Sequence, residues 1–178
     1  MWLGPEARAV VHRLKYGGLS RLGTLAADLI ARAVTRPSHT LLLPIPLTPA
    51  RRRHRGYNQA ASIAQALGRR WDLPVAQQVL LRHGQSTSQT RMAAGARSTN
   101  VAGAFLATTP PAWVGRAAAD VAHVAVGAGK PPAVIIVDDV FTTGATITAA
   151  ATALVEAGWS DIGAVTFARA VPIELQVL

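Results

Sequence analysis

Two adjacent carboxylates, Asp138 and Asp139, are the residues in this chain best suited to chemistry. They follow the apolar, mainly β-branched run 134–137, which predicts a strand buried on both faces. Residues 142–146 come next and lead into an alanine-rich helical run that closes at Gly158. Free N–H groups at a helix start attract a phosphate, threonine hydroxyls add donors, and carboxylates at a strand end can accept from ribose hydroxyls. The segment therefore predicts a binding site for a phosphorylated sugar.

A dense basic cluster is the second group with chemical potential. It consists of Arg51, Arg52, Arg53, His54 and Arg55, in a loop predicted to follow a short strand over 40–43. Four arginines in five positions repel one another, but near a pyrophosphate they offer bidentate donors matched to its oxygens. Two plainer interpretations remain open: a basic surface loop here, and an ordinary strand–helix turn capped by Thr143 in the acidic segment.

Hydrophobic periodicity predicts the elements that must position these groups. We expect helices over 6–15, 19–34 and 57–71, and further strands over 75–82, 101–106 and 162–167. The buried stripe of the second helix is predicted as Leu22, Leu25, Ala26, Leu29, Ile30 and Ala33, and that of the third as Ile63, Ala64, Leu67 and Trp71. Asn58 is either a helix cap or a ligand contact. Lys15 and Tyr16, before a double glycine, either contact a ligand or end a helix.

Charge and composition restrict the classes of function. Residues 1–105 hold 15 of the 18 Lys+Arg and 3 of the 9 Asp+Glu, a net charge of +12, so a polyanionic partner is expected. The absence of cysteine excludes disulfides and cysteine-bound zinc, and the five histidines show no metal-ligand spacing. Neither a leader nor an apolar run of membrane-spanning length is present. We therefore expect a cytoplasmic protein of one domain, 1–178, without a membrane partner.

Four stretches together resemble one known family, the ComF/GntX-like branch of the type I phosphoribosyltransferases. They are HRLKYGG (12–18), LLLPIPLTPARRRHRGYNQA (41–60), the stretch 89–105, and VIIVDDVFTTGAT (134–146). The last of these resembles the family's motif for phosphoribosyl pyrophosphate (PRPP) almost letter for letter. The resemblance implies an α/β fold with a mostly parallel sheet flanked by helices and a small hood. The PRPP-binding core would come from about 40–82 and 133–170, and the hood from about 1–36 and 83–106.

The resemblance also implies a reaction, which is Mg²⁺-dependent transfer of ribose 5-phosphate from PRPP to an unidentified nitrogen acceptor in nucleotide metabolism. Asp138 and Asp139 would bind the ribose hydroxyls directly or through Mg²⁺, and Arg53 and Arg55 would stabilise the departing pyrophosphate. The remaining substrate-binding residues implied are Val140, Phe141, Thr142, Thr143, Gly144, Ala145, Thr146, Arg51, Arg52, Asn58, Gln89, Arg97, Lys15 and Tyr16. The ligand is expected at the carboxyl ends of the strands.

Three departures from the family keep other functions open. Family members usually begin with a cysteine zinc ribbon, which this chain has lost or which lies outside this sequence. The loop over 83–97 carries Ala93, Ala94, Gly95 and Ala96 where charged residues are usual, and residues 107–132 are longer than the usual connector. The alternatives are a PRPP or nucleotide sensor without turnover, and a protein that binds single-stranded DNA in competence. Partnership with a second copy, as a homodimer, also stays open.

Overall fold

The computed structural model describes residues 9, 12–13, 21–37, 40–83, 103–109 and 133–169, and every structural statement below concerns these residues. Three strands form a parallel sheet: β1 (Thr40–Pro44), β4 (Ala133–Phe141) and β5 (Ile162–Arg169). Their order is β1-β4-β5, so the strand that carries the acidic pair lies in the middle. Val75 adds an isolated parallel bridge to Leu42 on the outer side of β1. The predicted α/β fold with a mostly parallel sheet is confirmed.

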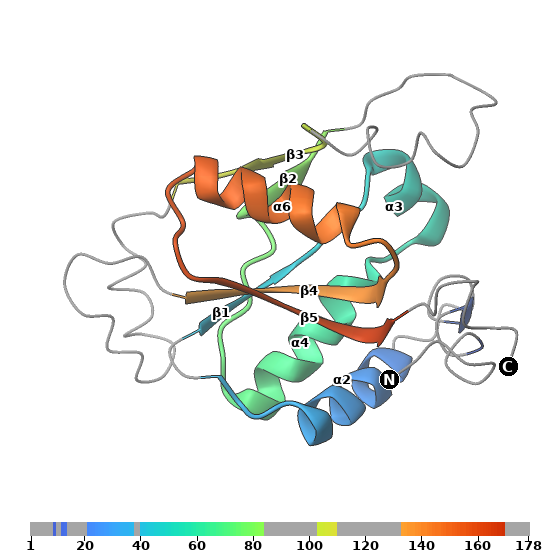
Figure 1. Ribbon diagram of the computed structural model, residues 1–178. Helices are drawn as coiled ribbons and strands as arrows, with labels where there is room; N and C mark the ends of the chain where they lie inside the picture. Colours follow the sequence, from blue (N-terminus) through green and yellow to red (C-terminus); the bar gives the residue numbers. More distant parts are fainter. Residues whose placement is uncertain are drawn as a thin grey trace, which may run out of the picture.

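Helices and a two-stranded antiparallel sheet cover the two faces of this sheet (Figure 1). On one face lie α2 (Arg21–Ala33) and α4 (Gln59–Trp71), and on the other α6 (Ala145–Glu156). The antiparallel pair β2 (Leu80–Arg82) and β3 (Phe105–Ala107) packs beside α6. Alternating side chains of β1 serve both layers, because Leu42 belongs to the cluster under α4 whereas Leu41 and Leu43 belong to the cluster under α6. The sheet is therefore covered on both faces, as parallel sheets usually are.

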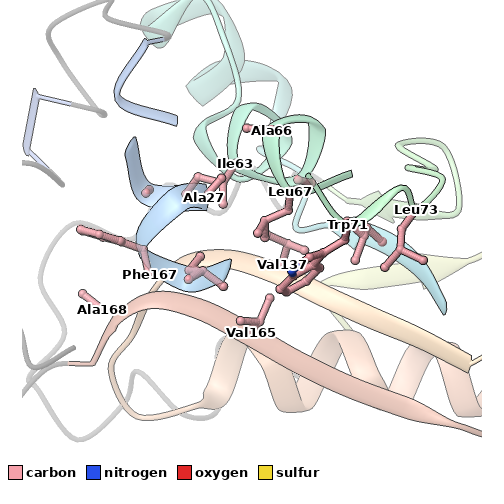
Figure 2. Packing of buried hydrophobic residues seen from close by; sticks show 14 residues of the cluster. Ala27, Ile63, Ala66, Leu67, Trp71, Leu73, Val137, Val165, Phe167 and Ala168 are labelled. Carbon is pink, nitrogen blue, oxygen red and sulfur yellow. The ribbon is translucent and has the colours of Figure 1, made fainter. Parts of the chain in front are cut away.

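The contact between α4 and the sheet fixes the direction of that helix. Leu67 and Trp71 are buried and point from α4 toward Val137 and Val165 in Figure 2. The full stripe predicted for this helix, which adds Ile63 and Ala64, is buried as expected. Burying a large apolar side chain contributes about 1.5–3 kcal/mol, so this face holds the helix start at the carboxyl ends of the strands.

Four sequence predictions of local structure are wrong in whole or in part. The basic cluster is not a loop but part of α3 (Pro49–Arg55), because Thr48 caps this helix by accepting from Arg51 N at 3.3 Å and Pro49 suits its first turn. The strand predicted over 75–82 is confined to β2, since the chain leaves β1 after Val75. Of the strand predicted over 101–106, residues 101–102 lie outside the described residues, and the rest is confirmed only from Phe105, where β3 begins.

The fourth error concerns the buried face of α2. Leu25 is 43% exposed and Ala33 is exposed, whereas Ala26, Ala27 and Ile30 are buried. The face is rotated because Gly23 meets α4, where an added Cβ would lie 2.2 Å from the Ser62 hydroxyl oxygen. Close approach of the two helices thus decides which residues are covered, and the small residues mark the contact.

Candidate active site

A cleft of about 330 Å³ opens at the carboxyl ends of β1 and β4. It lies among the end of β4, helix α3 and the starts of α4 and α6, which face the right-hand side of Figure 1. Its lining combines apolar, basic, amide, acidic and hydroxyl side chains: Ile45, Leu47, Ala60, Val140, Arg51, Arg55, Arg82, Asn58, Gln59, Asp138, Asp139, Thr142 and Thr146. We call this space the strand-end cleft. It is the position at which open α/β sheets bind ligands.

The acidic pair, Asp138 and Asp139, lies near the carboxyl end of the central strand β4. Asp138 pairs in register with Thr166 of β5, and both carboxylates are partly buried at the cleft. Asp138 Oδ1 accepts from Asp139 N at 2.8 Å, which restrains the orientation of the Asp138 carboxylate. Two half-buried carboxylates can accept hydrogen bonds from sugar hydroxyls without themselves donating.

These oxygens also fit a hard cation. Among the described residues no group of three or more His, Asp or Glu side chains gathers to hold a metal ion. Mg²⁺ is suited to such a place, because it keeps several waters and is commonly bound by one or two carboxylates together with substrate phosphates. Asp138 and Asp139 would be its protein ligands, with the substrate supplying the rest.

The loop between β4 and α6 follows the acidic pair in the chain and leads into the start of α6. Gly144 caps α6 with φ +82 and offers no side-chain acceptor to the first-turn N–H groups, while Thr143 Oγ1 accepts from Ala145 N at 3.4 Å. An added Cβ at Gly144 would lie 2.9 Å from the Phe141 ring. Both the positive φ and this close contact therefore favour glycine at the position. A helix start without a side-chain cap is open to an anion. Thr142 and Thr146 line the strand-end cleft, whereas Thr143 is exposed and does not.

Helix α3 divides the basic cluster into two sets. Arg51 and Arg55, four residues apart on one helical face, both line the strand-end cleft. Arg52 and Arg53 are exposed and lie outside its lining, so the structure does not bring the expected catalytic Arg53 into the cleft. Arg55 Nη1 donates to Gln59 Oε1 at 3.5 Å, which ties the end of α3 to the start of α4.

Asn58 holds the cleft wall in place in addition to lining it. Its Oδ1 accepts from Ala60 N at 3.1 Å and its Nδ2 donates to Ile45 O at 2.9 Å. The predicted helix cap is confirmed, and the same side chain anchors α4 to the loop that follows β1.

Sequence reasoning missed two polar residues of the cleft, Gln59 and Arg82, as well as its apolar residues Ile45, Leu47 and Ala60. The Arg82 guanidinium lies over the Phe105 ring, 5.0 Å from its centre. Burial lowers the pKa of Arg82, the charge of Arg51 lowers it further, and Asp138 opposes both. Strand alternation could have indicated this position, because Arg82 shares the face of the buried Leu80. Helical spacing could likewise have indicated Gln59, because it lies four residues before the buried Ile63 on the same face of α4.

The other predicted site residues are Lys15, Tyr16, Gln89 and Arg97, and they lie outside the described residues. Val140 lines the strand-end cleft, whereas Phe141 and Ala145 are partly buried at the neighbouring loop. The described helices include none that combines the length and apolar character needed to cross a bilayer.

The lining of the strand-end cleft contains two groups of donors suited to anions, together with the two carboxylates of the acidic pair. One is the start of α6 with Thr142 and Thr146, and the other is the basic wall formed by Arg51, Arg55 and Arg82. A ligand that carries phosphate groups and sugar hydroxyls would match all three parts.

Comparison with known proteins finds a distant similarity over most of the chain. No protein-family model matches the sequence. Over 170 residues the chain is 28% identical to Competence protein F from Haemophilus influenzae, an alignment that covers 90% of this chain and 67% of that protein. This similarity supports a relationship of the chain to ComF-like proteins.

Proposed function

We propose that the protein is an Mg²⁺-dependent phosphoribosyltransferase that binds PRPP and transfers ribose 5-phosphate to a nitrogen acceptor. One observation carries the proposal: the strand-end cleft unites the acidic pair, the hydroxyl-bearing start of α6 and two arginines of α3. PRPP carries a 5′-phosphate, two ribose hydroxyls and a pyrophosphate on C1, so its parts correspond to those three groups. The resemblance of 134–146 to the PRPP motif points the same way.

Each part of the cleft then has a role in the reaction. Thr142, Thr146 and the N–H groups at the start of α6 bind the 5′-phosphate. Asp138 and Asp139 accept from the 2′ and 3′ hydroxyls, which fixes the ribose ring relative to the acceptor. Bound Mg²⁺ would neutralise charge on the pyrophosphate oxygens.

The chemical step breaks the bond between C1 and the pyrophosphate oxygen and forms a bond between C1 and the acceptor nitrogen. The pyrophosphate leaves with the bonding electron pair, so negative charge grows at the basic wall. Arg55 and Arg51 stabilise that charge as it develops, with Arg82 on the β2 side of the cleft. The C1 centre becomes oxocarbenium-like, and its positioning and shielding from water matter more than a strong base.

Release of pyrophosphate from Mg²⁺-PRPP, measured with a panel of nitrogenous bases, tests the proposal. The wild type should release pyrophosphate with at least one base, and Arg55→Ala should lower kcat by roughly a hundredfold, as loss of a transition-state charge partner does. Arg53→Ala is the matched control, because Arg53 lies on the same helix outside the cleft lining. Equal loss in both variants would exclude the assigned basic wall. Saturable binding of PRPP without turnover would make the protein a sensor.

A second function has its own support, since the relative is named Competence protein F and the net charge of residues 1–105 is +12. Under this alternative the exposed Arg52 and Arg53 contribute to a surface for single-stranded DNA. Affinity for DNA should then fall steeply with salt, and Arg52→Ala with Arg53→Ala should reduce the salt slope by roughly 1–2. Absence of DNA binding at physiological ionic strength excludes this function.

A further inference from the structure

Gln59 is the one buried polar side chain among the described residues, with 2% of its surface exposed. Its Oε1 accepts from Arg55 Nη1, but its Nε2 is buried with no hydrogen-bond partner. The residue nevertheless belongs to the lining of the strand-end cleft. Its carboxamide therefore carries two N–H hydrogens without a partner, in a residue that lines the cleft.

An unused buried donor is unfavourable, and nothing about the helix requires one here. Gln59 stands four residues before Ile63, so its position continues the apolar stripe of α4. An apolar side chain of similar length, such as methionine, would fill this place without desolvating an amide. Retention of a polar group at such a position is explained if a ligand supplies the missing acceptor.

The surroundings of Gln59 determine what that acceptor is. Gln59 is the first residue of α4, a helix of 13 residues, so the positive end of the helix dipole lies at the same point. The Arg55 guanidinium is held against its Oε1. Donors from an amide, a guanidinium and a helix start together suit an oxygen that only accepts and carries negative charge.

We propose that Gln59 is a ligand-binding residue whose Nε2 donates to an anionic oxygen of the diphosphate group, while its Oε1 positions Arg55 toward the same group. The inference rests on the proposed function for the identity of the ligand, and it adds a neutral, directional contact to a wall that otherwise binds through charge.

Titration of inorganic pyrophosphate with Mg²⁺ into Gln59→Met and Gln65→Met tests the role of the amide. Gln65 is an exposed glutamine on the same helix, so it controls for the chemical change. Gln59→Met should weaken pyrophosphate binding roughly tenfold to a hundredfold, as loss of a hydrogen bond to a charged group does. Its urea midpoint should stay equal to that of the wild type or rise, because a buried donor without a partner is removed. Binding of ribose 5-phosphate, which lacks the diphosphate, should not change.

Three results would overturn the inference, and two of them concern the variants. One is pyrophosphate binding by Gln59→Met equal to that of Gln65→Met. The other is an equal loss of pyrophosphate and ribose 5-phosphate binding together with a lower urea midpoint, which would make Gln59 a structural residue. Failure of the wild type to bind pyrophosphate at all also contradicts it. A wild type that binds pyrophosphate but not PRPP would reject the proposed function, while the comparison of variants still decides the role of Gln59.

Discussion

Replacement of Gly144 by alanine tests whether the start of α6 is shaped for a phosphate. Gly144 has φ +82, and a Cβ there would lie 2.9 Å and 3.1 Å from two carbons of the Phe141 ring. The left-handed backbone alone costs a non-glycine residue about 1–2 kcal/mol. Displacing the Phe141 ring from its rotamer adds about 0.5–1.5 kcal/mol. We therefore expect Gly144→Ala to lower the free energy of unfolding by about 2 kcal/mol.

Gly103→Ala is the matched control for this prediction. Gly103 also has a positive φ, +74, but an added Cβ there meets nothing within 4 Å. It should lose about 1 kcal/mol, the backbone cost alone. Urea unfolding of both variants separates the two contributions, and titration with Mg²⁺-PRPP should show at least tenfold weaker binding for Gly144→Ala only. A folded Gly144→Ala that binds PRPP like the wild type would refute the assignment of this loop to the 5′-phosphate.

Three further predictions follow from side chains around the cleft and in the core. Arg82→Gln should weaken PRPP binding roughly tenfold, because loss of a hydrogen bond to a charged group costs about 1.5 kcal/mol. Arg169→Gln is the control and should leave PRPP binding unchanged, since Arg169 also lies over an aromatic ring but is outside the cleft lining. Asn58→Ala should lower the free energy of unfolding in urea by about 1–2 kcal/mol, since it removes a helix cap and the bond to Ile45 O; an unchanged midpoint would exclude this anchoring role. Trp71→Ala should cost about 3–5 kcal/mol in the same assay, and a loss below about 1 kcal/mol would contradict the packing in Figure 2.

Sequence patterns predicted the central part of the fold because local and tertiary preferences agree there. The apolar run of β4 suits a strand covered on both faces, and the chain ends α6 near Gly158, whose φ is +95. Asn58 begins α4 by the ordinary capping preference. The buried face of α2 could not be predicted, since it depends on contact of Gly23 with Ser62 of another helix.

The composition of the site was less predictable than its location. The basic cluster was predicted to lie in a loop after the first strand, yet the Thr48 cap and Pro49 start a helix. Only the helical geometry then separates Arg51 and Arg55, which line the cleft, from Arg52 and Arg53, which do not. Gln59 and Arg82 occupy positions whose spacing predicts burial in the core. Their place at the cleft could be recognised only once the neighbouring residues were known.

Calorimetric titration of Mg²⁺-PRPP into the wild type and into the Asp138→Asn, Asp139→Asn double variant tests the central claim most directly. Both substitutions keep the side-chain shape and remove the charge that would hold Mg²⁺. The proposal predicts micromolar binding by the wild type and loss of that binding in a double variant that remains folded. Failure of the folded wild type to bind PRPP, or equal binding by the double variant, would contradict it.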